Sequence, residues 1–229
     1  MKPNIFIALM PRENPPPCAY SSMFSLMKAC DTAREAGIDY EVNLMEHLPP
    51  GFMSWSSAID IFLREPKFTH LFIAGDDVDH PRGELKQLCE DDKDMVCPVY
   101  RTRLRERVIS AMNLGDEENK NISQYLNEKK LVRSPYILGH DPLIKRAVLE
   151  KLCADYPELV EGNPGEKQRY LFAMPFCEDG KWHLNDDWAI SRRAVRSGFE
   201  TWCDFGVILG HECGGYLYFP TVTVEDRPK

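Results

Sequence analysis

Residues 69–81 read Thr-His-Leu-Phe-Ile-Ala-Gly-Asp-Asp-Val-Asp-His-Pro, an apolar run that ends in a glycine and three aspartates. A continuous apolar run of this length is typical of a strand covered on both faces, as in a parallel sheet. Ligands of open α/β sheets bind beyond the carboxyl ends of such strands. We therefore expect Asp76, Asp77 and Asp79 to lie at a ligand-binding edge.

Strand and helix patterns alternate on both sides of this stretch. Strands are predicted over 4–10, 40–45, 69–75, 95–100 and 201–209, and helices over 21–35, 54–64, 83–90, 142–155 and 186–197. The predicted helices carry apolar residues three and four apart, and Gly37 and Gly198 are placed to end two of them. Residues 101–130 are weakly patterned, and we expect a loop or short hairpin there. The alternation predicts an α/β fold whose mostly parallel central sheet is flanked by helices.

The length and composition fit one soluble domain over residues 1–229. The chain has 229 residues, 43% of them hydrophobic, and a formal net charge of -8, which argues against a protein that mainly grips nucleic-acid phosphates. Its eight cysteines are scattered without a Cys-x-x-Cys pair, so reduced thiols are expected. The apolar run at the N-terminus stops at Pro11, too early to span a bilayer, and reads as a first strand. We therefore expect no membrane span and a cytoplasmic location.

The aspartates that follow the apolar run are candidates for metal ligands. Several anions in one turn repel one another unless a cation or hydrogen-bond donors compensate. A hard divalent cation with oxygen ligands is the natural compensator. The alternative is a solvated acidic turn, because Asp is a common turn residue.

Two later features complete the set of candidate residues. Asp186 and Asp187 open a predicted helix, where acids are favoured by the helix dipole, so they could cap that helix or serve as a catalytic base. His211 follows an apolar run and has glycines on both sides, so it could be a structural residue or a metal ligand. An imidazole beside carboxylates would suit Mn²⁺ better than Mg²⁺.

Taken in order, these features resemble one family. The segments THLFIAGDDVDHP and HLNDDWAISRRAVRSGFETWCDFGVILGH resemble the small GT-A glycosyltransferases of phages and large viruses. The resemblance covers most of the chain and implies a single GT-A domain, which is Rossmann-like. Residues 1–100 would form its nucleotide-sugar-binding half and residues 101–229 its acceptor-binding half. A viral protein would then work in the host cytoplasm.

The resemblance also implies roles for individual residues. Asp77 and Asp79 match the Asp-x-Asp metal motif, Asp76 is an alternative or additional member, and His211 corresponds to a late histidine that completes the metal shell. Pro11 and Arg12 would face the nucleotide together with Asp76 and Asp77. Asp186 or Asp187 corresponds to the acid near the acceptor, which is the base in inverting members, and Asp204 corresponds to an acid that we take as structural.

The expected activity is the metal-dependent transfer of a hexose or pentose from a nucleotide-diphosphate sugar, of the UDP type, to an acceptor hydroxyl. The cation would be Mn²⁺ or Mg²⁺, and the acceptor a glycan, a protein or hydroxymethylated DNA. The alternating arginines at 101, 103, 105 and 107 could line a phosphate groove or form an exposed edge. Two rivals stay open, a metal-dependent phosphohydrolase or nuclease and a non-catalytic protein that binds sugar nucleotides.

Overall fold

A sheet of nine strands organises the part of the chain that the computed structural model describes, which is residues 2–11, 19–100, 122–135, 141–178, 180–183, 186–213 and 216–218. Its main path runs β13-β12-β5-β7-β3-β1-β2, and β4 and β6 pair with β12. The strands are β1 (Asn4–Met10), β2 (Asp39–Leu44), β3 (His70–Gly75), β4 (Val78–Asp79), β5 (Met95–Tyr100), β6 (Leu131–Ser134), β7 (Leu143–Lys145), β12 (Thr201–Cys213) and β13 (Tyr216–Tyr218).

The sheet is mostly parallel. β1 runs parallel to β2 and β3, and β5 runs parallel to β12. The short β7 is antiparallel to both β3 and β5, so these two longer strands share one direction. The other antiparallel members, β4, β6 and β13, all pair with β12. The carboxyl ends of β1, β2, β3, β5 and β12 therefore lie at one edge, as the sequence predicts for a ligand-binding α/β sheet.

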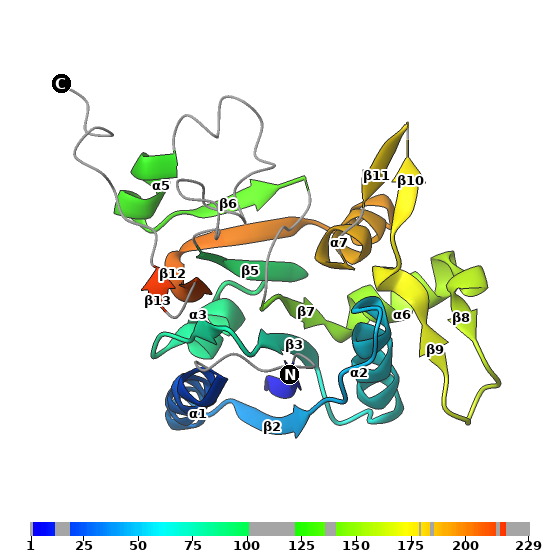
Figure 1. Cartoon of the computed structure of the whole chain (residues 1–229), viewed down its shortest axis with the longest axis horizontal. Helices are drawn as coiled ribbons and strands as arrows, with labels where there is room; N and C mark the ends of the chain where they lie inside the picture. The colour runs from blue at the N-terminus through cyan, green and yellow to red at the C-terminus, as the bar shows by residue number, and fades with distance from the viewer. Residues whose placement is uncertain are drawn as a thin grey trace.

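Helices cover both faces of the sheet (Figure 1). They are α1 (Ala19–Glu35), α2 (Phe52–Arg64), α3 (Glu84–Glu90), α5 (Ile122–Glu128), α6 (Arg146–Asp155) and α7 (Asp186–Arg196), with two short 3₁₀ turns, η1 (Pro157–Leu159) and η2 (Leu171–Ala173). Two small hairpins lie beside the sheet, β8 (Val160–Glu161) with β9 (Arg169–Tyr170) and β10 (Phe176–Glu178) with β11 (Lys181–His183). No helix in the described ranges is long and apolar enough to cross a membrane.

Strand β1 shows how the two faces are built. Its side chains alternate, as a pleated strand requires. Ile5 and Ile7 pack in a cluster with residues of α1 and α3, and Phe6 and Ala8 pack in a second cluster with residues of α2, α6 and α7. All four are fully buried. This three-layer packing is why β1 is apolar throughout instead of alternating with polar residues.

The chain between 141 and 155 differs from the prediction of one helix over 142–155. Leu143–Lys145 forms β7, and the helix begins only at Arg146. Leu143 packs with the α1 cluster and Ile144 with the α2 cluster, so the two neighbours face opposite sides of the sheet. An adjacent apolar pair fits a helix start and a short strand equally well, and pairing with β3 and β5 decides in favour of the strand.

Residues 122–128 also differ from the prediction, because they form α5 where a loop or hairpin was expected. The partly buried Ile122 and Leu126 and the buried Tyr125 lie three or four residues apart and pack against the core. The remainder of the expected excursion, including the arginines at 101, 103, 105 and 107, lies outside the described residues.

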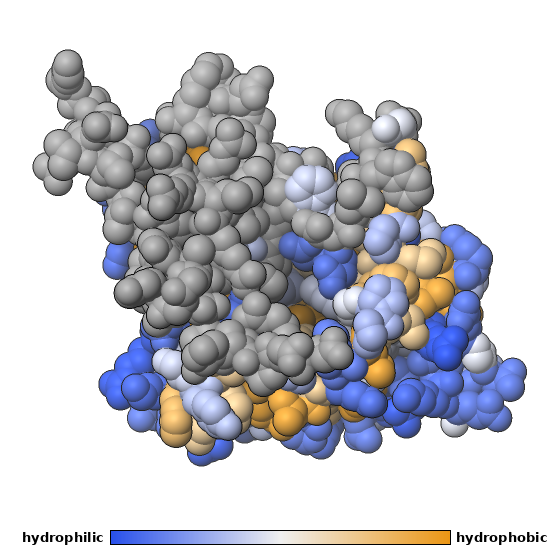
Figure 2. All heavy atoms as spheres, in the orientation of Figure 1, coloured by the Kyte–Doolittle hydropathy of each residue, from blue (hydrophilic) through white to orange (hydrophobic). Residues whose placement is uncertain are grey.

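The sheet ends at β2, and this margin carries an exposed apolar strip. Tyr20, Phe24 and Met27 of α1 and Val42 and Leu44 of β2 are all more than 40% exposed. Figure 2 shows apolar residues along the margin where Figure 1 places α1 and β2. Edge strands have unpaired backbone groups on their outer side, so this margin combines an open sheet edge with exposed apolar side chains.

Arg146, the first residue of α6, joins this helix to the C-terminal end of α2 and to the chain just before β3. Its guanidinium donates to the carbonyl oxygens of Phe62, Leu63, Glu65 and Phe68 over 2.7 to 3.4 Å. It also lies over the ring of Phe62, with its carbon 4.4 Å from the ring centroid. The last carbonyls of a helix have no partner within the helix, so one arginine here satisfies α2 and ties it to α6.

Arg146→Met should lower the free energy of unfolding by about 2 kcal/mol, because several partly buried carbonyls lose a charged donor. Lys86→Met is the matched control, since Lys86 only pairs with Glu90 on the exposed side of α3, and it should change stability by less than about 0.5 kcal/mol. Urea denaturation measures both. Equal effects would show that Arg146 is not a structural cap.

Candidate functional site

The three predicted aspartates lie in a turn at the carboxyl end of β3. Gly75 is the last residue of β3 and is paired with Met10, the last residue of β1. β4 follows within three residues and runs antiparallel to β12, so the turn folds back over the sheet edge. We call Asp76–Asp79 the acidic turn.

Hydrogen bonds from two other elements fix the acidic turn at both ends. The Gly75 N–H donates to Asp141 Oδ1 over 2.7 Å, and the Gly75 carbonyl accepts from the hydroxyl of Ser22 over 3.1 Å. After the turn, the His80 N–H donates to Ser25 Oγ over 2.9 Å. Two serines of α1 and one aspartate before β7 therefore hold the backbone on which the aspartates stand.

The carboxylates of the turn are largely withdrawn from solvent. Asp76 and Asp77 are each 4% exposed, and Asp79 is half-buried. Their charges reach residues beneath the turn, since Asp77 contributes to raising the pKa of Asp141 and Asp79 contributes to raising that of His80. Buried carboxylates in such number favour a cation among them.

Three further charged side chains lie fully buried under the turn. They are His80, Glu84 and Asp141, which we call the buried triad. The His80 Nδ1 lies 2.8 Å from Glu84 Oε2. Burial lowers the pKa of His80, but the Glu84 carboxylate outweighs it, and the pKa rises to about 9. Burial is the main cause that raises the pKa of Asp141 to about 8, although His80 opposes it. The triad therefore favours positive charge at its centre.

The predicted late histidine comes to the same edge through its backbone. In the ladder between β12 and β4, Gly210 pairs with Asp79 and His211 pairs with Val78. The chain thus brings residue 211 beside the acidic turn across more than 130 positions of sequence. Its side chain lies outside what the structure describes.

Asp186 and Asp187 stand at the start of α7 and are half-buried. Asp187 Oδ1 accepts the N–H of Trp188 over 2.8 Å. A methyl group added at Gly51 would lie 3.2 Å from Asp186 Oδ2, so Asp186 sits against the residue before α2. Because α2 follows β2 in the chain, its start lies near the carboxyl end of that strand. Both acids are therefore on the same edge of the sheet as the acidic turn.

The contacts of Arg193 hold α7 in place. Arg193 donates to the carbonyls of Phe172 and Met174, and its guanidinium carbon lies 4.4 Å from the ring centroid of Phe176. Burial lowers the pKa of this arginine to about 10.

The buried thiol of Cys97 in β5 is affected by two of the acids. Its pKa is raised mainly by burial, and the charges of Asp187 and Asp141 contribute to the rise. Asp187 and Asp141 therefore both lie within electrostatic reach of β5.

A cavity of about 610 Å³ opens beside the start of α2. Leu48, Pro49 and Met53 line one side, and Lys167 and Arg169 of the β8–β9 hairpin line the other. The hairpin is fastened to α2, because Gln168 N–H donates to Asp60 Oδ1 and Tyr170 N–H to Ser56 Oγ. Gly51, which touches Asp186, lies in the chain between two of the lining residues.

The remaining predicted residues are placed as follows. Pro11 is half-buried directly after β1, and its carbonyl oxygen lies 3.2 Å from Nδ1 of His47. Arg12 lies outside the described residues. Sequence reasoning missed Ser22, Ser25, Glu84 and Asp141 altogether and gave no role to His80. Only the spacing of His80 and Glu84, four apart across a helix start, could have indicated that they meet.

Asp204 lies away from the acidic turn, in β12, with Asp91 as its neighbour. Its Oδ1 accepts the N–H of Gly206 over 2.7 Å, and burial raises its pKa. Burial, followed by the charge of Asp204, raises the pKa of Asp91 from 3.8 to about 7. Two buried carboxyls side by side favour keeping a proton between them.

Comparisons with known proteins place the fold but not the family. No protein-family model and no curated protein matches the chain. Among solved structures, A197 from STIV is similar over 98% of this chain and 96% of that chain, with a TM-score of 0.53 and 14% identity. The likeness to A197 shows a shared α/β fold.

Two further solved structures are similar at a lower level. One is a protein of Bacillus anthracis described as a putative glucose-1-phosphate thymidylyltransferase, in complex with sucrose. Its TM-score is 0.36 at 9% identity, over 66% of this chain and 74% of that chain. The other is HddC from Yersinia pseudotuberculosis, with a TM-score of 0.34 at 10% identity, over 69% of this chain and 80% of that chain. TM-scores this low are too weak to support an argument.

The raised pKa of Asp91 gives a testable dependence on pH. The folded protein holds a proton that the unfolded chain releases at lower pH, so this contribution to stability is full below pH 3.8 and is lost as pH rises towards about 7. Asp91→Asn removes the loss, so the variant should gain stability relative to the wild type between about pH 5 and pH 8, measured by urea denaturation.

Asp92→Asn is the matched control. The hydrogen bond from Lys145 lowers the pKa of Asp92, so its contribution is present above the ordinary value and is lost only as pH falls below it. Its difference from the wild type should stay constant over the same range. A parallel change in both variants would disprove the paired-carboxyl explanation.

Proposed function

We propose that the chain is a metal-dependent glycosyltransferase with a GT-A fold, which transfers a sugar from a nucleotide-diphosphate donor to an acceptor hydroxyl. The observation that carries this proposal is the acidic turn, whose two most buried aspartates stand at the carboxyl end of β3 and are anchored from both sides. The fold shared with A197, similar over nearly the whole length of both chains, is compatible with it.

The residues of the turn fit a hard divalent cation. Asp76, Asp77 and Asp79 offer carboxylate oxygens within four positions, and oxygen donors are what Mg²⁺ and Mn²⁺ prefer. Burial of Asp76 and Asp77 makes their mutual repulsion costly without a compensating charge. A bound cation would neutralise the negative charge that develops on the departing diphosphate.

The chain's own groups would divide the remaining work. The acceptor oxygen attacks the anomeric carbon, the bond from that carbon to the diphosphate oxygen breaks, and the electron pair leaves with the diphosphate. Asp186 or Asp187 would take the proton of the acceptor hydroxyl if the configuration inverts. In a retaining enzyme this carboxylate would have another role.

The cavity beside α2 is a candidate for acceptor binding. It adjoins Gly51, against which Asp186 lies, and its volume lies within the range of small-molecule sites. Arg169 is paired with Glu161, which also lines the cavity, so Lys167 is the cation that would favour a negatively charged group of the acceptor. Leu48 and Met53 would pack on a sugar ring or a base. The donor would lie over the carboxyl ends of β1 and β3, where Pro11, Asp76 and Asp77 are gathered.

Asp77→Asn tests the metal role. The change keeps the size of the side chain and removes its charge, so it should lower metal-stimulated transfer roughly 100-fold or more. A panel of nucleotide sugars, each with and without Mn²⁺, identifies the donor by the rise in melting temperature, and released nucleoside diphosphate then measures turnover. Asp39→Asn alters an exposed acid that is paired with Lys2. This control should leave both the rise in melting temperature and the rate of turnover unchanged.

The same assay separates the rivals. Cleavage of a phosphodiester or release of phosphate without sugar transfer would identify a hydrolase. Binding of a nucleotide sugar without turnover under any acceptor tried would identify a non-catalytic binding protein. Full activity of Asp77→Asn would remove this carboxylate from the site.

The two acids of α7 can be told apart by substitution. Asn at either position keeps the shape, and at 187 it also keeps the oxygen that accepts the Trp188 N–H. The residue that acts as the base should lose about 10²–10⁴-fold in kcat with little change in donor binding. The other should lose much less. If neither variant slows turnover, the proton leaves by another route and the assignment of a base to α7 is wrong.

A further inference from the structure

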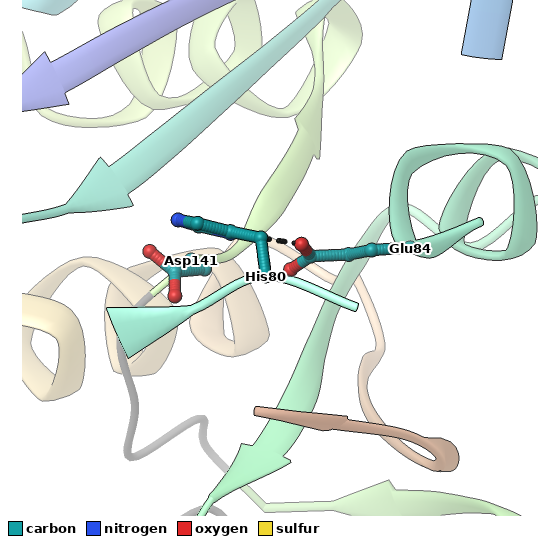
Figure 3. A group of neighbouring side chains, drawn as sticks. All are labelled: His80, Glu84 and Asp141. Atoms are coloured by element: carbon teal, nitrogen blue, oxygen red, sulfur yellow. Dashed lines mark hydrogen bonds and ion pairs between the residues drawn. The ribbon is translucent and has the colours of Figure 1, made fainter. Parts of the chain in front are cut away.

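The buried triad beneath the acidic turn carries an inference of its own. His80 follows β4, Glu84 is the first residue of α3, and Asp141 stands directly before β7 in a left-handed conformation, with φ of 68°. Their side chains are withdrawn from solvent, with 0% exposure for those of His80 and Glu84 and 0% for residue Asp141. Figure 3 shows the imidazole between the two carboxyl groups.

Glu84 determines how the imidazole presents itself to Asp141. Its Oε2 lies 2.8 Å from Nδ1 of His80, the distance of a hydrogen bond to an ionised carboxylate. Nδ1 then carries a proton, and the second nitrogen, Nε2, points towards Asp141 (Figure 3). A carboxylate that orients a histidine in this way is a common partner of metal-ligating histidines.

The atoms that face each other across the triad have no bond between them. Within the described part of the chain, neither His80 Nε2 nor Asp141 Oδ2 has a hydrogen-bond partner, although both are buried. Asp141 Oδ1 is already occupied by the N–H of Gly75. A proton shared by the two atoms would draw them to hydrogen-bond distance. Two buried polar atoms that face each other without a partner cost free energy.

We propose that the buried triad binds a structural divalent cation, with Zn²⁺ as the best fit, in addition to any cation held by the acidic turn. His80 Nε2 and Asp141 Oδ2 would be the protein ligands, Glu84 would orient the imidazole, and water would complete the four-coordinate shell. One ligand atom from each of the three residues lies within 4.8 Å of the others, so a cation needs only a small inward movement of the side chains.

The chemistry of the site selects the kind of ion. Nitrogen and oxygen donors together suit Zn²⁺ and Mn²⁺ and disfavour Mg²⁺ and Ca²⁺, which prefer oxygen alone. A divalent ion also balances the charge, since it neutralises the carboxylates of Glu84 and Asp141 beside a neutral imidazole.

The position of the ion would give it a defined task. Asp141 accepts the Gly75 N–H with one oxygen and would bind the ion with the other, and the His80 N–H is held by Ser25. The ion would therefore join both ends of the acidic turn to α3 and the start of β7. It would stabilise the fold even if the acidic turn proved to have no catalytic part.

Cobalt(II) is the probe for this site, because it replaces Zn²⁺ and absorbs visible light when bound to a histidine. The wild-type chain, expressed with added Co²⁺ and passed over a chelating resin, should keep about one ion per chain and show that absorption. Added Zn²⁺ should raise the melting temperature of the metal-free protein by several degrees. These readouts use the wild type and do not depend on any variant.

Two variants then locate the ion. Asp141→Asn keeps an oxygen for the Gly75 N–H and should still fold, as circular dichroism would show, but should lose the tightly held cobalt. Asp77→Asn, which disables the cation of the proposed function, should retain it. Loss of the ion in Asp77→Asn but not in Asp141→Asn would place it in the acidic turn and overturn the inference, while leaving the glycosyltransferase proposal intact.

A wild type that keeps no cobalt, with no visible absorption and no stabilisation by Zn²⁺, would overturn the inference outright. A histidine NMR signal of a doubly protonated imidazole in that protein would identify a proton as the compensating charge. Neither result bears on metal-stimulated sugar transfer, which the Asp77→Asn assay tests separately.

Discussion

The backbone N–H and the backbone carbonyl of Gly75 are both hydrogen-bonded to side chains from other parts of the chain. The arrangement of acids at the sheet edge depends on these two bonds. Asp141 binds the N–H and Ser22 binds the carbonyl. A strand end would ordinarily leave these groups to water, and the turn that follows would be free to move. Here the acidic turn starts from a fixed point, so its carboxylates are pre-positioned before any ligand arrives, which is the condition for effective electrostatic catalysis.

This anchoring places negative charge where it is costly. Asp76, Asp77, Glu84 and Asp141 are each less than 5% exposed, and His80 is the one basic side chain in the buried triad. Like charges in a poorly solvated region destabilise the fold unless a counter-charge joins them. The Glu84 carboxylate raises the pKa of His80 although burial lowers it, so the buried triad also favours a positive charge. Cation binding and folding are therefore expected to be linked at this edge.

The sequence predicted the layers of the fold better than the interior of the site. β1 and β3 are apolar runs bounded by Pro11 and Gly75, and a pattern of this kind has few alternatives. Gly198 adopts a positive φ of 93° directly after α7, as a helix-ending glycine should. By contrast, Leu143 and Ile144 could begin a helix or form a strand. Only their pairing with β3 and β5 in the folded sheet selects the strand.

The buried triad was beyond reach for a different reason. Asp141 is 66 positions from Gly75, to which it bonds, and no local pattern marks an aspartate that will be buried opposite a strand end. His80 and Glu84 were visible only as ordinary residues at the start of a short helix. The acidic turn could be found because its members adjoin one another, whereas the residues that support it meet only through the order of strands.

That strand order also brings two groups of acids to one edge of the sheet. The acidic turn and Asp141 lie at the end of β3, and the acid pair lies at the start of α7, against Gly51. Asp187 and Asp141 both contribute to raising the pKa of Cys97 in β5, so both groups act on the same strand. The acids proposed to hold a cation and the acid proposed to take a proton therefore come from different segments, the turn after β3 and the start of α7. A carboxylate that binds a cation is ionised, but its oxygens are engaged by the ion, so proton transfer from the acceptor needs a separate acid.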